Sequence, residues 1–178
     1  IRSMANAGLL KPVTIEQQIN LDMPDWNQPK PVLSPSQAVA ASTLVKAVGK
    51  SVDEASETGF TVTLLDGVTG SGKTEVYFEA IASTIAAGRQ VLVLLPEIAL
   101  TAQWLERFAT RFSAYPLKWH SGLTVAERRL IWRAIVSDKA SVLVGARSAL
   151  FLPFSSLGLI VVDEEHDASF KQDDGVCY

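Results

Sequence analysis

Apolar residues follow two different spacings along the chain from Ser34 onward. Three short runs are apolar without interruption, a pattern typical of strands that are covered on both faces. These runs are residues 91–95, 142–144 and 159–162. Elsewhere apolar residues recur at the spacing of a helix face, and they predict helices over residues 35–49, 73–87, 98–112 and 125–136. A further extended run, Phe60–Leu65, predicts a strand ahead of the second helix. Strands that alternate with helices of this length predict an α/β fold, a parallel sheet with helices on both faces.

The ends of several helices carry local signals. Ser34 and Gln37 flank a proline at the first helical position, which gives the first helix a capping residue and a partner for it. Thr124 and Glu127 have the spacing of a capping box at the start of the last helix. Gly88 predicts the end of the second helix, because glycine readily adopts the left-handed conformation that stops a helix.

The residues before Val32 differ in composition from the rest of the chain. All three asparagines and four of the 8 prolines lie there. This composition favours an extended linker over residues 13–33, ahead of a globular domain over residues 34–178. Residues 1–12 are expected to be the tail of a preceding domain. Ile1 is not an initiator methionine, so we expect the chain to be part of a longer protein.

A glycine-rich loop matches the phosphate-loop pattern G-x-x-x-x-G-K-[ST]. Its residues are Gly67, Val68, Thr69, Gly70, Ser71, Gly72, Lys73 and Thr74. The glycines let successive backbone N–H groups turn toward one concavity, and the following helix adds its positive end. Lys73 would reach the β- and γ-phosphates, and the hydroxyl of Thr74 would coordinate Mg²⁺. Because the loop lies between a predicted strand and a predicted helix, we interpret it as a nucleotide site rather than a glycine turn with a surface lysine.

Carboxylates follow the last apolar run directly. Asp163 and Glu164 would lie at the carboxyl edge of the sheet, where open α/β sheets bind ligands. Asp163 is placed to hold Mg²⁺, and Glu164 to orient or deprotonate the attacking water. The alternative is a solvated acidic turn, which the phosphate loop disfavours. For His166 a structural hydrogen bond remains an alternative to a functional role.

The distribution of charge indicates a second function. The whole chain has 48% hydrophobic residues and a net charge of −3, which indicates a globular domain and excludes a polycation. Residues 104–133 nevertheless carry six basic and two acidic residues, a local charge of +4, interleaved with aromatic residues. Single-stranded nucleic acid binds such surfaces. The alternative is structural, with Phe108 and Phe112 in the core and Arg107 and Arg111 in an exposed row.

Several classes of protein are disfavoured. The single cysteine, Cys177, cannot form an internal disulfide or a multi-cysteine zinc site. No apolar run approaches the roughly 18 residues of a membrane span, and no signal peptide opens the chain, so we expect a cytoplasmic protein without a membrane partner. The absence of any asparagine after Asn27 argues against a GTPase, whose guanine-reading motif needs one.

Six segments in one order resemble the superfamily 2 helicases, and among them the bacterial replication-restart helicases. The segments are residues 34–37, 67–74, 95–101, 119–123, 145–151 and 163–167. The phosphate loop is widely shared, but Pro-Glu-Ile-Ala-Leu-Thr at 96–101, Arg-Ser-Ala-Leu-Phe at 147–151 and Asp-Glu-Glu-His at 163–166 are close to this one group. The resemblance implies a RecA-like P-loop fold. It also implies an ATP-dependent DNA helicase, 3′-to-5′ in polarity, that acts in primosome assembly and in the restart of stalled replication forks.

The resemblance also implies roles for individual residues. Gln37 would read the adenine edge of ATP, unless it only completes the cap with Ser34. Thr101, Arg147 and Ser148 match segments that contact the DNA backbone, and His166 would couple the ATP site to the DNA. The implied cofactors are ATP and Mg²⁺. The implied partners are forked and single-stranded DNA, other primosome proteins and single-strand-binding protein, at the bacterial nucleoid.

The family has parts that this sequence does not show. These are a Ser-Ala-Thr segment of the first lobe, a second lobe and a zinc module, so zinc is expected only there. Residues 1–12 would end a winged-helix-like DNA-binding region. An arginine finger contributes about 10³- to 10⁵-fold to turnover and belongs to the second lobe, so we expect the chain alone to be nearly inactive. Another P-loop nucleotide-binding module or kinase, without helicase activity, remains the alternative.

Overall fold

The computed structural model describes residues 21–29, 31–49, 60–96 and 102–167. Four strands in these ranges form one parallel sheet in the order β2-β3-β1-β4. They are β1 (Gln90–Leu94), β2 (Leu117–Trp119), β3 (Val142–Gly145) and β4 (Leu157–Val162). Val91 pairs with Val142 on one side and with Leu159 on the other, so β1 lies between β3 and β4. The parallel sheet predicted from the sequence is confirmed.

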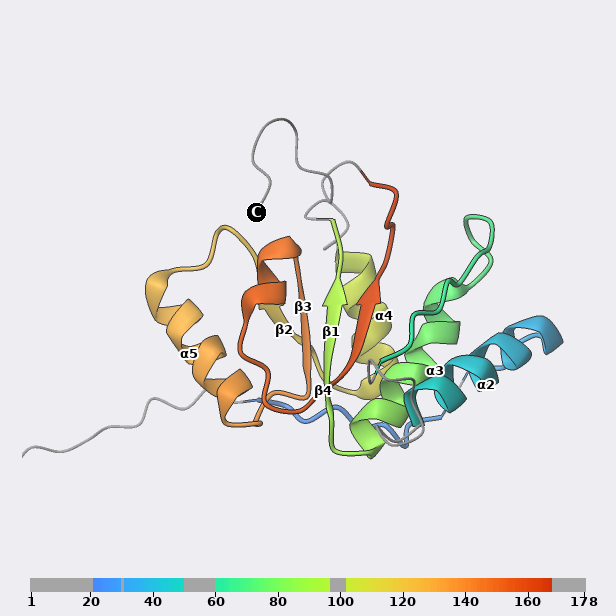
Figure 1. Cartoon of the computed structure of the whole chain (residues 1–178), viewed down its shortest axis with the longest axis horizontal. Coiled ribbons are helices and arrows are strands. Elements are labelled where there is room, and N and C mark those ends of the chain that lie inside the picture. The colour runs from blue at the N-terminus through green and yellow to red at the C-terminus, as the bar shows by residue number, and fades with distance from the viewer. Residues whose placement is uncertain (1–20, 30, 50–59, 97–101, 168–178) are drawn as a thin grey trace, which may run out of the picture.

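Helices cover both faces of the sheet (Figure 1). They are α2 (Pro35–Gly49), α3 (Lys73–Ala86), α4 (Ala102–Phe112), α5 (Val125–Val136) and the 3-10 helix η2 (Arg147–Phe151). α3 and α4 pack on one face, α5 and η2 pack on the other, and α2 packs on α3. No helix within the described ranges has the length and apolar character that a membrane span requires.

The central strand β1 supplies side chains to both faces. Val91 and Val93 point toward α3 and α4, whereas Leu92 and Leu94 point toward α5 and η2, because successive residues of a strand alternate in direction. Every residue of β1 and of β3 is buried. Their uninterrupted apolar runs therefore reflect cover on both faces, as predicted.

Phe78 of α3 lies at the centre of the core between α3, α4 and the sheet. Its ring is fully buried and meets the rings of Trp104, Phe108 and Phe112 of α4 edge-on, at centroid distances of 5.8, 5.8 and 5.5 Å. Each such aromatic pair contributes about 0.5–1.5 kcal/mol beyond the area that it buries. This packing fixes α4 against α3.

Gln90 is a buried polar residue at the start of β1. Its side-chain amide donates to the carbonyls of Ile135 (3.0 Å) and Ala140 (3.1 Å). Its side-chain carbonyl accepts from the backbone N–H groups of Ser155 (3.0 Å) and Ser156 (3.1 Å). One side chain thus satisfies backbone groups from the end of α5, the approach to β3 and the entry to β4.

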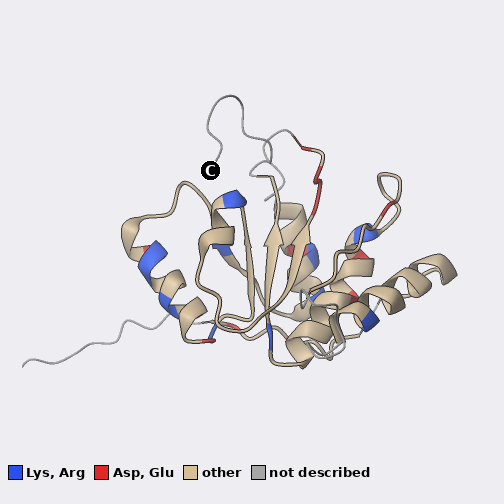
Figure 2. Cartoon of the chain, in the orientation of Figure 1, with Lys and Arg blue, Asp and Glu red and all other residues tan. Residues whose placement is uncertain are grey.

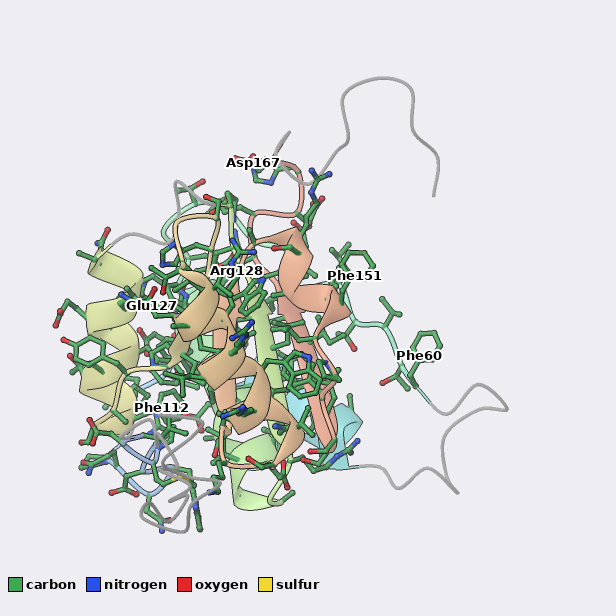
Figure 3. The ribbon with its side chains drawn as sticks, turned by 90° about the vertical axis from the view of Figure 1, so that its left-hand side faces the viewer. Phe60, Phe112, Glu127, Arg128, Phe151 and Asp167 are labelled. Carbon is green, nitrogen blue, oxygen red and sulfur yellow. The ribbon has the colours of Figure 1, made fainter. Side chains whose placement is uncertain are left out.

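The segment Phe60–Leu65, expected to be a strand, has no regular secondary structure. The side chains of Phe60, Val62 and Leu64 are 64%, 86% and 79% exposed. Phe60 lies at the margin of the molecule, away from the sheet (Figure 3). Only Leu65 packs against the core of α3 and α4. The prediction was wrong because a strand needs a hydrogen-bonding neighbour, and no strand of the described ranges pairs with this segment.

β4 is partly buried on one face and more exposed on the other. Leu159 and Val161 pack against the core of α3 and α4, whereas Ile160 and Val162 are 45% and 46% exposed. On the second face α5 and η2 pack over β1 and β3, and among the residues of β4 only Leu157 packs against that core. The prediction of cover on both faces was therefore wrong for β4, which is the edge of the described sheet.

Arg111 is buried, although the helical spacing predicted an exposed row. It is 4% exposed, and its guanidinium lies 3.1 Å from Oε1 of Glu79 and donates to the carbonyl of Gln28 at 3.2 Å. The carbonyl of Phe112 accepts from the backbone N–H of Asp25 at 2.8 Å. Part of the predicted linker is thus held against the end of α4. The boundaries proposed for the linker and its neighbours stay a prediction.

Replacing Gln90 with leucine is expected to lower the free energy of unfolding by about 2–4 kcal/mol, since hydrogen bonds to four backbone groups are lost together. Urea denaturation followed by circular dichroism measures this loss. Gln103→Leu, at an exposed position of α4, is the matched control and should stay within about 0.5 kcal/mol of the unsubstituted chain. Equal stability of the two variants would contradict the structural role of Gln90.

Candidate nucleotide-binding site

The glycine-rich loop leads directly into α3. Gly70 and Gly72 have φ angles of 78° and 80°, in the left-handed region that favours glycine. Gly72 is the N-cap of α3, and no side chain caps the helix there. The first N–H groups of α3 therefore remain available to an anion at the positive end of the helix.

Lys73 lies over the phosphate loop. Its ammonium nitrogen donates to the carbonyl of Gly67 at 2.5 Å and approaches the carbonyl of Val68 at 3.4 Å. A Cβ added to Gly67 would come within 2.8 Å of the Ser71 hydroxyl, so a side chain there would require the Ser71 side chain to move. The ammonium and the open N–H groups face a compact loop whose chemistry fits a polyphosphate.

Gln37 connects α2 to the phosphate loop. Its side-chain carbonyl accepts from the backbone N–H of Ser34 at 2.8 Å, and its backbone N–H donates to the Ser34 hydroxyl at 3.3 Å. Its side-chain amide also donates to the carbonyl of Ser71 at 2.8 Å. The capping interaction is therefore observed, and it occurs together with a contact to the loop. Recognition of adenine by Gln37 stays a prediction.

Asp163 follows β4 and lies beside α3. Its backbone N–H donates to the carbonyl of Leu94 at 3.0 Å, so the sheet ladder continues to this residue. Its Oδ2 accepts from the hydroxyl of Tyr77 at 2.8 Å, and that hydroxyl accepts from the indole N–H of Trp104 at 2.7 Å. Burial, followed by the charge of Asp163, raises the pKa of Tyr77, so the phenol stays protonated. Asp163 and the helix that follows the phosphate loop therefore lie in contact. In the sequence they were visible only as two separate motifs.

Thr74 and Asp163 are the residues expected to hold Mg²⁺. Thr74 lies three residues before Tyr77 on α3, and therefore on the same face of the helix. Against the larger effect of burial, a hydrogen bond from the Thr74 side chain acts to lower the pKa of Tyr77. The described residues contain no group of three His, Cys, Asp or Glu that could hold a metal. Mg²⁺ is usually held by one or two carboxylates together with waters and substrate phosphates. A single carboxylate beside the loop thus fits a magnesium ion that arrives with a nucleotide.

Glu164 and His166 lie in the turn after β4. Glu164 has a φ of 54°, and its carbonyl accepts from the N–H of Asp167 at 2.8 Å, which closes the turn. Oε2 of Glu164 lies 3.4 Å from Nε2 of His166, and the side chains are 50% and 76% exposed. A non-glycine residue held in this conformation is often found at functional sites. The catalytic role of Glu164 and the coupling role of His166 stay predictions.

The residues predicted to contact DNA, as far as they are described, lie at the same carboxyl edge of the sheet as Asp163, but beside β2 and β3 rather than beside β4. Thr101 is outside the described residues. Arg147 and Ser148 begin η2, immediately after β3. The hydroxyl of Ser148 accepts from the indole N–H of Trp119 at 3.1 Å, and the guanidinium of Arg128 lies 5.5 Å from the centre of the Trp119 ring. The ends of β2 and β3 and the first turns of α5 thus form one basic and aromatic cluster.

The basic and aromatic segment divides between core and surface. Phe108 and Phe112 of α4 are buried, which confirms the structural alternative for these two residues, and Trp104 is buried with them. Trp132 of α5 is 47% exposed. Basic residues lie on α5 and η2, whereas several acidic residues lie in the segment directly after β4 (Figure 2). The nucleic-acid interpretation therefore applies to α5 and the ends of β2 and β3.

Tyr77 and Trp104 were not recognised from the sequence as residues of the nucleotide site. Both occupy apolar positions of helices, where an aromatic residue normally belongs to the core, and both are indeed buried. The available signal was the spacing of Tyr77, three residues after Thr74, which places it on the helix face of a phosphate-binding residue.

A parallel sheet with a glycine loop at the start of one helix and a carboxylate at the end of a strand defines a P-loop nucleotide-binding protein. The DEAD/DEAH box helicase family matches residues 46–176, and the chain belongs to this family.

Proteins named replication restart protein PriA are similar to the chain. The one from Rickettsia conorii is 60% identical over 116 residues, which cover 65% of this chain and 18% of the relative. The one from Haemophilus influenzae is 51% identical over 120 residues, 67% of this chain and 16% of the relative. The one from Synechocystis is 40% identical over 173 residues, 97% of this chain and 20% of the relative. The chain spans about a fifth or less of the length of these relatives.

Alanine at Gly72 should be more destabilising than alanine at Gly70. Both substitutions place a Cβ on a left-handed residue, which costs about 1–2 kcal/mol. Only at Gly72 would the Cβ also come within 2.5 Å of the Gln37 amide and displace it from Ser71, whereas it would meet nothing at Gly70. Urea unfolding of both variants tests this difference.

The Gln37→Ala background supplies the control, because there the added Cβ at Gly72 has no amide to displace. The two alanine variants should then lose equal stability. Equal losses in the unsubstituted background would contradict the contact between Gln37 and the loop.

Proposed function

We propose that this chain supplies the ATP- and magnesium-binding part of the first lobe of a DNA helicase that restarts stalled replication forks. The observation that carries the proposal is the hydrogen bond between Tyr77, on the helix that follows the phosphate loop, and Asp163, at the end of β4. It brings the two halves of an NTPase site into contact. Membership of the DEAD/DEAH box family and similarity to proteins named replication restart protein support the restart role.

Each residue of the nucleotide site has a distinct task in this proposal. The N–H groups of the loop and the ammonium of Lys73 bind the β- and γ-phosphates, which requires Lys73 to leave the carbonyl of Gly67. Thr74 and Asp163 hold Mg²⁺, which neutralises charge on the phosphates. Glu164 is exposed beside Asp163 and accepts a proton from the attacking water. Gln37 contributes to adenine recognition from the start of α2.

The DNA track lies at the ends of β2 and β3. Arg147 and Ser148 bind backbone phosphates, and Trp119, held by Ser148 and Arg128, offers a ring for base stacking. Thr101 extends this track, and His166 transmits the state of the nucleotide. The partners are forked and single-stranded DNA, with primosome proteins and single-strand-binding protein, in the bacterial cytoplasm. Zinc belongs to other parts of the longer protein.

Replacing Lys73 with alanine should weaken ATP binding by about 10- to 100-fold, because a charge-assisted hydrogen bond to phosphate is lost. Titration calorimetry of the chain measures the affinity. Lys139→Ala removes an exposed lysine that lies before the start of β3, and it should leave the ATP affinity unchanged. Unchanged binding by the Lys73 variant would remove the basis of the nucleotide assignment.

Glu164→Gln in the longer protein should retain ATP binding and lower turnover by about 10²- to 10⁴-fold, because glutamine cannot accept the proton from water. Steady-state release of phosphate in the presence of DNA tests this, with Glu165→Gln as the adjacent exposed control. Intact turnover in the Glu164 variant would assign the proton acceptor elsewhere.

Binding of single-stranded DNA should weaken as salt increases, with a log–log slope of about −0.7 for each phosphate neutralised. Arg147→Ala should lower the affinity and reduce the slope by about 0.7, whereas Lys139→Ala, beyond the other end of β3, should change neither. Fluorescence anisotropy with a labelled oligonucleotide measures both quantities. A slope near zero for the unsubstituted chain would favour a P-loop kinase or another nucleotide-binding module over a helicase lobe.

A further inference from the structure

Three side chains from three different elements form one continuous chain of hydrogen bonds that ends at the candidate magnesium ligand. The indole N–H of Trp104 on α4 donates to the hydroxyl of Tyr77 on α3, at 2.7 Å. The same hydroxyl donates to Oδ2 of Asp163 at 2.8 Å. Of these three residues, only Asp163 has a role in the proposed ATP and magnesium binding, so Tyr77 and Trp104 are without an assigned role.

The direction of these hydrogen bonds follows from chemistry. An indole N–H can only donate, and an ionised carboxylate can only accept. The hydroxyl of Tyr77 has a single proton, which must point to Asp163 while its oxygen accepts from Trp104. Trp104 therefore selects one rotation of the Tyr77 hydroxyl, the one directed at the carboxylate.

Both oxygens of Asp163 receive a donor from the protein. Oδ2 accepts from Tyr77, and Oδ1 accepts from the backbone N–H of Glu164 at 3.1 Å. Two donors on opposite oxygens fix the plane of the carboxylate. A carboxylate has about four acceptor positions, so each oxygen keeps one for a metal or a metal-bound water.

The donors are themselves held rigidly. Tyr77 and Trp104 are 5% and 7% exposed. The ring of Phe78 meets that of Tyr77 at 5.5 Å and that of Trp104 at 5.8 Å, both edge-on. Trp104 also stacks on Phe108 at 5.4 Å. The orientation of Asp163 is thus set by the aromatic core between α3 and α4.

We propose that Tyr77 is a positioning residue for the magnesium site, and that it acts by holding the Asp163 carboxylate in the orientation that receives nucleotide-bound Mg²⁺. Trp104 supports it by fixing the direction of the hydroxyl. This inference rests on the proposed function, because it requires the chain to bind ATP with Mg²⁺. Hydrogen-bond partners of metal ligands typically contribute about 10- to 100-fold to metal affinity.

The test measures the Mg²⁺ dependence of ATP binding by the whole chain, with titration calorimetry at a series of Mg²⁺ concentrations and in EDTA. Tyr77→Phe removes the hydroxyl and keeps the ring. The Mg²⁺ concentration that half-saturates the gain in ATP affinity should rise about 10-fold or more, whereas the affinity in EDTA should stay unchanged.

Tyr115→Phe is the matched control. Its hydroxyl also donates to a carboxylate, Oε1 of Glu106, at 2.8 Å, but Tyr115 is exposed in the loop between α4 and β2. This variant loses the same atom and the same kind of hydrogen bond, and it should leave the Mg²⁺ dependence unchanged.

A double variant separates positioning from stability. Tyr77→Phe alone leaves the buried N–H of Trp104 without its acceptor, and it should lower the melting temperature. Adding Trp104→Phe removes that N–H, so the melting temperature should partly recover, but the Mg²⁺ requirement should stay raised. Trp104→Phe alone should raise the Mg²⁺ requirement less, because Tyr77 can still donate to Asp163.

Two results would overturn the inference. If Tyr77→Phe has the Mg²⁺ dependence of the unsubstituted chain, Tyr77 is only structural, and the proposed nucleotide site stands without it. If the Mg²⁺ requirement recovers together with the melting temperature in the double variant, the effect is one of stability. Failure of the unsubstituted chain to bind Mg²⁺ and ATP would instead remove the proposed function and this inference with it.

Discussion

The burial of α3 on almost every side is the constraint on which the rest of the structure depends. Nine of its 14 residues are buried, and Phe78 and Ile81 have no exposed surface. A helix covered by α2, by the sheet and by α4 cannot turn or slide without exposing large side chains to water. Lys73 and Thr74 at its first turn therefore have a fixed position relative to the end of β4. The phosphate-binding end of the site is located by a hydrophobic core and not by the loop alone.

A helix that is buried on almost every side must also satisfy its buried polar side chains internally. Glu79 pairs with Arg111, Tyr77 bonds with Trp104 and Asp163, and the hydroxyl of Thr84 bonds with the carbonyl of Ala80. An apolar contact between α3 and α4 would tolerate several registers, but the pairs of Glu79 with Arg111 and of Tyr77 with Trp104 are satisfied in only one. The polar pairs thus specify the orientation of α4 that the aromatic packing stabilises. The same orientation places Trp104 behind Tyr77.

Sequence reasoning located most elements because their signals are local. The capping box of Thr124 and Glu127 is present in both directions, and the glycine loop lies where its pattern placed it. The failures all depend on contacts distant in sequence. Arg111 has a surface pattern and is buried because Glu79 and Gln28 come to meet it. β2 was missed because it has three residues, of which the central Lys118 is exposed, and among the described strands it pairs with β3 alone. Tyr77 was invisible as a site residue because its partners lie 27 and 86 residues away.

The ends of all four described strands are joined by backbone hydrogen bonds beyond the ladder itself. The N–H of Asp163 bonds with the carbonyl of Leu94, the N–H of the next residue, Leu95, bonds with the carbonyl of Gly145, and the N–H of Ala146 bonds with the carbonyl of Trp119. β1 and β3 are buried throughout, so they cannot shift independently. The candidate magnesium ligand and the candidate DNA residue Arg147 are therefore held at a fixed separation. In the proposed helicase lobe, nucleotide and DNA would influence each other by rigid-body movement of the lobe or through loops at the sheet edge, and not by distortion of the sheet between them.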